Sequence, residues 1–351
     1  MYKRGTLLSA KNSGNFIPNT IVYIPLNLDH NKWKKMVKSL DDIEIVLNPD
    51  QKSWMDIVDW CSRTEGWLFT AGDYQTWLKS FEKFWFFAAI DKESKEAVGS
   101  VTLAYDRSAS GNEDEDIYYV GFYYVRPEWR STGLGTLLFE KIMEIGKGHN
   151  MALHAVMRMS PRYAAKYGFD KMPPYKHDFV SIPIEHLSVP QCWSDPQYTL
   201  KDLSEVDEAK VVAFDVGICH RKRDVYLRNF ISSKDSFTKV ALNSSGDVVG
   251  IGCVRVVYSN ELCAGPLYAD NEAVAKSLLA GILSSIPDIR QYKSFGSLYP
   301  AINTEAASIF NEMGGGYAKS EPFTQCQFTK KVFPTDDVRV YAMLECACSA
   351  T

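Results

Sequence analysis

The order of predicted secondary-structure elements repeats once along this 351-residue chain, and this repeat constrains the fold more than any other feature. Segments rich in β-branched and aromatic residues predict strands, and amphipathic segments predict helices. In the first half, three strands, a helix, a strand and a short helix are predicted at 84–90, 97–105, 117–125, 133–146, 151–156 and 161–167. The same order recurs at 238–242, 248–257, 262–268, 271–284, 294–298 and 304–313. Such a repeat indicates an internal duplication. We therefore expect two tandem α/β (α+β) domains, each a mostly antiparallel mixed sheet flanked by helices.

A cluster of prolines and polar residues at about 187–196 predicts the boundary between the two domains. The first domain is predicted at 41–188, where the strand 43–47 and two helical stretches within 51–82 come first and a strand at 179–184 comes last. The second is predicted at 196–335 and begins with a helix at 206–218. A lead-in at 1–40, with a short helix near 33–40, and a tail at 336–351 complete the chain. Two domains suit this length, since domains usually hold roughly 100–200 residues.

The charge and the distribution of apolar residues exclude several classes of function. The formal net charge is −4, and binding to nucleic acid needs a broad basic face. No apolar run approaches the ~20 residues of a membrane span, and the first residues lack the apolar core of a secretory signal. Eight cysteines are scattered without a C-x-x-C pair, which favours reduced thiols and a cytoplasmic location, with the nucleus as an alternative. We expect no nucleic-acid or membrane partner, and a homodimer is compatible with the sequence.

The sharpest local motif lies where the strand at 117–125 runs into the helix at 133–146. Its sequence is Val-Arg-Pro-Glu-Trp-Arg-Ser-Thr-Gly-Leu-Gly-Thr at 125–136. Two glycines allow a ligand to approach the backbone closely, and the unpaired N–H groups of a first helical turn favour an anion. Arg130 adds a guanidinium suited to phosphate. The predicted diphosphate cradle consists of Arg130, Ser131, Thr132, Gly133, Leu134, Gly135 and Thr136. The spacing matches neither a Walker loop nor a dinucleotide-binding fingerprint.

This Arg-x-x-Gly-x-Gly spacing, together with Gly168-Phe169 one strand and one helix later, resembles the GNAT N-acetyltransferase superfamily. The resemblance implies that acetyl-CoA is the cosubstrate and that no metal takes part. It implies that the pantetheine arm lies along Tyr123, Tyr124 and Val125, like an added β-strand. The thioester would then lie where the strands 117–125 and 151–156 splay apart.

At the catalytic positions the chain departs from the family pattern. Acetyl transfer needs a neutral amine and a proton for the departing thiolate. The family's tyrosine position holds Ala164, so Tyr163 is the best substitute as acid, with plain aromatic packing as the alternative. Tyr119, relaying a proton through water, and Glu115 are the candidate bases. A solvated acidic loop is the alternative for Glu115.

The second half resembles the C-terminal acetyltransferase-like domain of YitH-type bacterial proteins, through the run Gly-Pro-Leu-Tyr-Ala-Asp at 265–270. Where the first half has its phosphate loop, this half has Asp270 and Glu272, and two carboxylates repel a diphosphate. Phe310 stands at the tyrosine position. We expect this half to keep the fold without a cofactor site.

The predicted function is transfer of acetyl from acetyl-CoA to an amine, by direct attack within a ternary complex. A small-molecule amine is favoured as the acceptor. The alternatives are a catalytically weak acyl-CoA-binding sensor or structural protein, and a protein lysine acetyltransferase.

Overall fold

The computed structural model describes residues 38–333 and 335–349. Most of the short helix expected near 33–40 lies outside these residues. In the first half the main elements follow the predicted order. Their bounds are β1 Ile43–Leu47, α2 Gln51–Glu65, α3 Asp73–Ser80, β2 Phe84–Asp91, β3 Ala97–Asp106, β4 Ile117–Val125, α4 Leu134–Ile145, β5 Asn150–Val156, α5 Ser160–Tyr167 and β6 His177–Pro183.

The second half repeats this order, with elements that the sequence did not predict. Their bounds are β7 Thr199–Asp202, α6 Glu208–Cys219, α7 Asp224–Ile231, β8 Ser236–Leu242, β9 Val248–Val256, β10 Leu262–Ala269, α8 Glu272–Ser285, β11 Ser294–Pro300, α9 Thr304–Gly314, β12 Lys319–Phe328 and β13 Val340–Ala342. The additions are β7, α7, β12 and β13. The mixed α/β architecture with two similar halves is confirmed.

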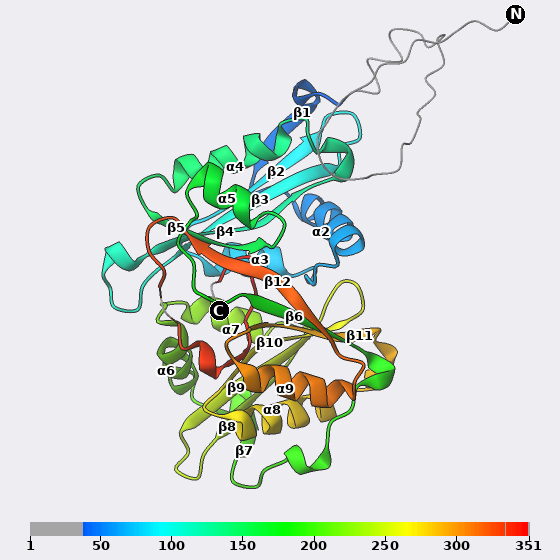
Figure 1. The fold of residues 1–351 in the computed structure, drawn as a ribbon, viewed down its shortest axis with the longest axis vertical. Coiled ribbons are helices and arrows are strands. Elements are labelled where there is room, and N and C mark those ends of the chain that lie inside the picture. The colour runs from blue at the N-terminus through cyan, green and yellow to red at the C-terminus, as the bar shows by residue number, and fades with distance from the viewer. Residues whose placement is uncertain (1–37, 334, 350–351) are drawn as a thin grey trace, which may run out of the picture. The chain divides into compact units, whose positions relative to one another are not determined.

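The two halves share one continuous sheet because they exchange strands (Figure 1). Its order is β1-β2-β3-β4-β5-β12-β6-β11-β10-β9-β8-β7, with β13 paired to β10. Strand β12 of the second half pairs antiparallel with β5 of the first. Strand β6 of the first half pairs antiparallel with β11 of the second. The predicted segments 41–188 and 196–335 therefore do not correspond to two separate sheets, since each half supplies a strand that the other half's sheet needs.

Helices cover both faces of the sheet, and one hydrophobic core spans the two halves. Helices α4 and α5 pack with the apolar side chains of one face of the first half. On the other face, a single core combines side chains of α2 and α3 with those of α6, α7 and residues 343–348. Helix α2 shows why these elements form. Asp50 caps its first turn by accepting from the amide of Ser53 at 2.9 Å, Trp54 and Ile57 lie on its buried face, and Gly66 ends it with φ of 69°.

Most of the described residues of the predicted tail at 336–351 pack against the rest of the protein. Strand β13 pairs with β10, and the amide of Met343 donates to the carbonyl of Leu298 at 2.8 Å. Ala347 then lies against Gly121 of β4, where a Cβ atom on the glycine would come within 1.6 Å of the Ala347 carbonyl oxygen. Residues 343–349, here called the C-terminal segment, thus run from the second half to β4 of the first.

Candidate functional site

A bulge in β4 separates it from its parallel neighbour β5. The two strands pair only from Ile117 opposite Asn150 to Val120 opposite Leu153. The pairing of β4 with β3 shifts register just beyond that point, and Phe122 has φ of 42°, which is rare for a bulky residue. In the described part of the chain, no strand pairs with 121–125 on the edge that faces β5. The predicted splay of the two strands is therefore present, and it leaves an open strand edge.

The loop that follows β4 presents a row of free backbone amides. Within the described residues, no hydrogen bond is made by the N–H groups of Ser131, Thr132, Gly133, Gly135 and Thr136. Helix α4 has Gly133 at its N-cap and no side-chain cap. Positive φ angles at Ser131 (69°) and Gly133 (96°) give the loop its turn. Consecutive unbonded N–H groups at a helix start form an anion site, so these residues fit a diphosphate.

Arg130 lies at this loop but is already engaged by the protein. Its Nε donates to the carbonyl of Val125 at 2.9 Å, and its Nη2 donates to Glu65 at 2.7 Å. The other carboxylate oxygen of Glu65 accepts from Arg158 at 2.7 Å. Burial raises the pKa of Glu65, but the hydrogen bonds and charges of Arg158 and Arg130 outweigh it and hold the pKa below its usual value. Two guanidiniums on one carboxylate leave a net positive charge beside the free amides.

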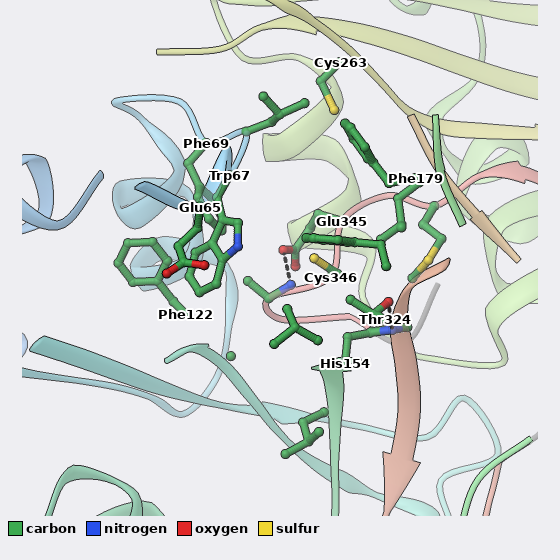
Figure 2. Close-up of a pocket in the computed structure, with 18 of the residues that line it drawn as sticks. Glu65, Trp67, Phe69, Phe122, His154, Phe179, Cys263, Thr324, Glu345 and Cys346 are labelled. Atoms are coloured by element: carbon green, nitrogen blue, oxygen red, sulfur yellow. Dashed lines mark hydrogen bonds between the residues drawn. The ribbon is translucent and has the colours of Figure 1, made fainter. Parts of the chain in front are cut away.

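A cavity of about 310 Å³ opens where β4 and β5 diverge and extends between the two halves. Its lining is mainly aromatic and aliphatic, and Figure 2 shows Trp67, Phe69 and Phe122 on one side with Phe179 and Cys263 on the other. Ligand pockets typically combine such an apolar lining with a few polar groups. Here the ionisable groups at the wall are Glu65, Asp73, His154, Tyr123, Tyr163, Arg255, Cys263, Glu321, Glu345 and Cys346.

Glu345 of the C-terminal segment lines this cavity and lies between Trp67 on one side and Phe179 on the other (Figure 2). One carboxylate oxygen accepts from the Tyr226 hydroxyl at 2.7 Å and the Cys348 amide at 2.6 Å, and the other accepts from the Ala347 amide at 2.6 Å. Burial raises the pKa of Glu345 to about 7, against the lowering effect of these hydrogen bonds. A carboxyl that titrates near neutrality is suited to act as a general base. The sequence offered no signal for it, since an acidic residue near the end of a chain is ordinarily solvated.

Of the predicted catalytic residues, Tyr163 reaches the cavity and Tyr119 does not. Tyr163 lines the wall and stacks on Phe139 at 5.3 Å between ring centroids. Burial raises the pKa of Tyr163, which keeps its hydroxyl protonated. Tyr119 is fully buried, and its hydroxyl has no hydrogen-bond partner among the described residues. Because β4 turns Tyr119 into the core rather than toward the cavity, the role of base predicted for it is not supported.

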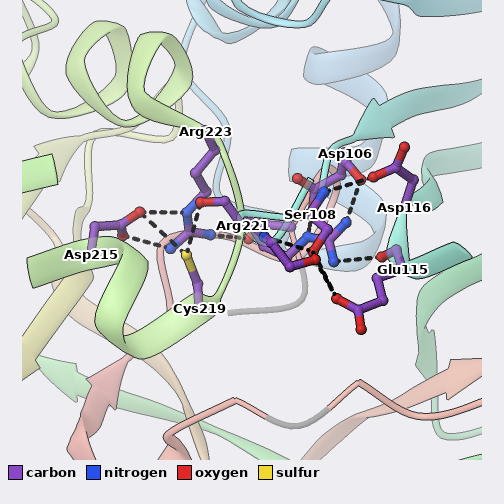
Figure 3. Close-up of polar contacts among 10 residues, drawn as sticks. Asp106, Ser108, Glu115, Asp116, Asp215, Cys219, Arg221 and Arg223 are labelled. Atoms are coloured by element: carbon purple, nitrogen blue, oxygen red, sulfur yellow. Dashed lines mark hydrogen bonds and ion pairs between the residues drawn. The ribbon is translucent and has the colours of Figure 1, made fainter. Parts of the chain in front are cut away.

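Glu115 lies before β4, outside the cavity, and is also not supported as a base (Figure 3). Its carboxylate accepts from the hydroxyls of Ser108 at 3.0 Å and Ser110 at 2.7 Å. The hydrogen bond from Ser110 and then that from Ser108 lower its pKa. Its main-chain carbonyl accepts from Arg221 at 2.8 Å. Glu115 thus organises a loop at the contact between the two halves.

The predicted cofactor-binding tyrosines lie on opposite faces of β4. Tyr123 lines the cavity and reaches under the loop, where a Cβ atom on Gly135 would come within 2.4 Å of its hydroxyl. Burial raises the pKa of Tyr123 to about 12. The Tyr124 side chain points to α2, where its hydroxyl lies 2.9 Å from that of Thr64. Gly135 is therefore required by the packing of Tyr123 as well as by close approach of a ligand.

In the second half, the protein's own chain fills the place of the open strand edge. Strand β10 pairs with β11 only from Leu262 to Ala264, and β13 then occupies the gap by pairing with Leu267 and Tyr268. At the start of α8, the Asn271 side chain accepts from the Val274 amide at 3.1 Å. Asp270 is ion-paired with Arg339 at 2.5 Å. The features that leave an anion site open in the first half are thus capped or filled here.

Two models of one protein family match the chain where these two halves lie. The model described as "Acetyltransferase (GNAT) family" matches residues 54–169. The model described as "Acetyltransferase (GNAT) domain" matches residues 211–289. Together with the repeated fold, these matches show that the chain carries two GNAT domains in tandem and belongs to the GNAT superfamily.

Among proteins similar to this chain are a bacterial enzyme and two solved structures. The holothin acyltransferase of Pseudoalteromonas sp. (strain SANK 73390) is 23% identical over 260 residues, which cover 74% of this chain and 77% of that enzyme. A putative acetyltransferase from Pyrococcus horikoshii superposes with a TM-score of 0.59 at 13% identity, covering 88% of this chain and 96% of that one. A tandem GNAT protein from the clavulanic acid biosynthesis pathway gives 0.56 at 14% identity, covering 82% and 97%. At these identities the structures establish a shared acyltransferase fold. In the part of the chain that the structure describes, no helix is long and apolar enough to cross a membrane.

Proposed function

We propose that this protein is an acyl-CoA-dependent N-acyltransferase that transfers an acetyl group to a small-molecule amine. The observation that carries the proposal is the contrast between the two halves. In the first, a run of unbonded amides at the start of α4 adjoins an open edge of β4. In the second, the protein's own strand fills the equivalent edge. Only the first half thus keeps a groove suited to a diphosphate joined to an extended chain.

The residues of this groove have distinct proposed roles. The free amides of Ser131, Thr132, Gly133, Gly135 and Thr136, with the positive charge of Arg130 and Arg158 beside them, would hold the diphosphate of acyl-CoA. The amide of Leu134, also predicted for this role, donates instead to the Thr132 hydroxyl at 3.3 Å. The free edge of β4 at 121–125 would align the pantetheine arm. The bound acyl-CoA supplies the thioester carbonyl that the amine attacks. Glu345 would take a proton from the amine, and Tyr163, whose hydroxyl stays protonated, would lie beside the leaving sulfur.

The size and lining of the cavity support a small acceptor. A volume of about 310 Å³ is at the lower end of the ≈ 300–1,000 Å³ range of small-molecule sites. The cavity is bounded by strands of both halves and by the C-terminal segment, which suits a compact amine better than a lysine on a protein surface. The relative named holothin acyltransferase is an acyltransferase by its name, which agrees with the proposed class of reaction.

The test is release of CoA thiol from acetyl-CoA across a panel of amines, with Arg130→Glu as the variant. A carboxylate beside the free amides should repel the diphosphate and raise the KM for acetyl-CoA by about tenfold or more, which corresponds to one charge-assisted hydrogen bond of roughly 1.5–3 kcal/mol. Arg228→Glu is a matched control. Arg228 is also paired with a glutamate, at 2.6 Å, and its side chain is 46% exposed against 45% for Arg130.

Two outcomes would contradict the proposal. Equal KM values for Arg130→Glu and Arg228→Glu would remove the cofactor site from this loop. Tight binding of CoA without release of thiol for any amine in the panel would favour an acyl-CoA-binding protein over an enzyme.

A further inference from the structure

A buried arginine forms part of the cavity wall that the second half contributes. Arg255 lies in β9 and is 4% exposed. It lines the same cavity as Glu345 and Trp67. The guanidinium carbon lies 3.7 Å from the centroid of the Phe230 ring, so the ring covers one face of the cation. An arginine this deeply buried is costly unless its donors are satisfied.

Only part of the guanidinium is satisfied by the protein. Its Nη1 donates to Asp73 at 2.6 Å. Its Nε and Nη2 make no hydrogen bond to a described residue. Neither nitrogen is among the fully buried polar atoms without a partner, so both keep some exposed surface. Because Arg255 lines the cavity, the access that these two nitrogens keep is from the cavity side. Nε and Nη2 form the edge of a guanidinium that takes a carboxylate with two parallel hydrogen bonds.

Asp73, the ion-pair partner of Arg255, is held in a fixed position. Both oxygens of Asp73 are bound by Thr70, one by the hydroxyl and the other by the main-chain amide, each at 2.8 Å. Asp73 and Arg255 come from different halves of the chain and are both almost fully buried. The carboxylate of Asp73 balances the arginine's charge and fixes its orientation, which leaves the free edge of the guanidinium as a preorganised hydrogen-bond donor.

We propose that Arg255 binds a carboxylate carried by the acceptor, so that the acceptor is an amine with an apolar body and a carboxylate, of the chemical class of the amino acids. This inference rests on the proposed acyl transfer, since it deepens the identity of the amine. Glu345 and Arg255 line the same cavity, so one site offers a partner to each of the two charged groups of such a zwitterion. Glu345 is the proton acceptor for the amine, and Arg255 is the donor for the carboxylate. The aromatic lining of the cavity accommodates an apolar side chain.

The test compares amines that differ only in the carboxylate. Acetyl transfer is measured for phenylalanine against phenethylamine, tryptophan against tryptamine, and leucine against isoamylamine. The wild-type protein should favour the carboxylate member of at least one pair by about tenfold or more in kcat/KM, since a charge-assisted bidentate pair is worth ~1.5–3 kcal/mol. Arg255→Gln should reduce that ratio to near one by lowering kcat/KM for the amino acid alone.

Because Arg255 is buried, Arg255→Lys and Arg223→Gln accompany the main variant. The lysine keeps the charge but loses the two-pronged geometry, so it should recover only part of the ratio. Arg223 is another arginine paired with an aspartate, is also 4% exposed, and lies outside the cavity lining. Its loss should lower stability without changing the ratio. A wild-type protein that transfers acetyl to amines but favours no carboxylate member would overturn the inference and leave the proposed function intact.

Binding separates the two proposals when no transfer is seen. Calorimetry with 3-phenylpropionate, which has the carboxylate but no amine, should show binding to the wild type and about tenfold weaker binding to Arg255→Gln. Such binding without acetyl transfer to any amine would support the carboxylate site and contradict the enzyme. Equal affinity for wild type and Arg255→Gln would contradict the site.

Discussion

The chemistry of Glu345 comes from its surroundings more than from its residue type. Burial is the largest influence and raises its pKa to about 7, with the charge of Asp73 acting in the same direction. The hydroxyl of Tyr226 and the two amides of the C-terminal segment oppose this shift. Tyr119, Cys346 and Cys348 also feel the charge of Glu345, and burial raises the pKa of each. The burial that raises the pKa of these three neighbours keeps them protonated at neutral pH.

We predict that Glu345→Gln lowers kcat by about 10²-fold or more, the usual contribution of a general base. A base must be unprotonated to act, so wild-type kcat/KM should rise as pH increases through about 7. That inflection should vanish in the variant, which leaves only the rise due to deprotonation of the amine itself. The measurement is the pH profile of CoA-thiol release at fixed saturation with acetyl-CoA.

Glu305→Gln is the matched control, because Glu305 also accepts a hydrogen bond from a tyrosine, Tyr341, but does not line the cavity. Its profile should follow the wild type. An unchanged inflection near pH 7 in Glu345→Gln would show that another group is the base.

At the scale of elements, the helix start and the neighbouring strand edge are open in the first half, whereas their equivalents in the second half are capped and covered. The loop before α4 leaves its amides free, whereas α8 is capped by Asn271. The open edge of β4 corresponds to an edge of β10 that β13 covers. The sequence predicted the loss of the second site from two carboxylates, Asp270 and Glu272. The tertiary structure gives a second reason to expect this, because β13 already occupies the edge of β10.

One CoA per chain is therefore expected from calorimetric titration, with no second site up to millimolar CoA. Displacing β13 would break backbone hydrogen bonds and expose Val340 and Ala342, both fully buried, so CoA cannot compete for that edge. A stoichiometry of two, or a second binding event that Arg130→Glu leaves intact, would contradict this expectation.

At the scale of the whole molecule, strand exchange ties the two halves into one folding unit. Strand β6 lies between β12 and β11, and both of these come from the second half. The halves are also joined by buried ion pairs, including Arg221 with Asp106 and Arg255 with Asp73. Separating the halves would leave unpaired strand edges and unpartnered buried charges, each strongly unfavourable.

We predict that residues 38–188 produced alone do not reach a native fold, whereas the full chain unfolds in a single cooperative transition. Circular dichroism and calorimetry would measure both. Without the second half, β5 loses β12 and β6 loses both neighbours. A well-folded first half that binds CoA by itself, or two separate transitions in the full chain, would show that the strand exchange is dispensable.

The sequence by itself determined what depends on neighbouring residues in the chain. The order of the elements, the helix that opens at Gly133 and the phosphate loop all follow from local spacing and residue type. Tyr163, which lines the cavity, was chosen through the resemblance to the GNAT superfamily, as the tyrosine nearest the family's position. Tyr119 and Glu115 lie outside the cavity lining for a physical reason. Tertiary packing decides that the side chain of Tyr119 on the bulged strand β4 is buried in the core. It also decides that Glu115 is bound by two serine hydroxyls. Local spacing in the sequence carries no information on either.

Only the tertiary structure decided which distant segments meet. Strand β12 is separated from its partner β5 by more than a hundred residues of chain, and hydrogen bonding between strands has no preference for a particular sequence at such separation. The same holds for Glu345 and Arg255, which lie far from the loop in sequence and are brought to the cavity by β13 and β9. Their burial, which gives each its chemistry, is a property of the assembled molecule.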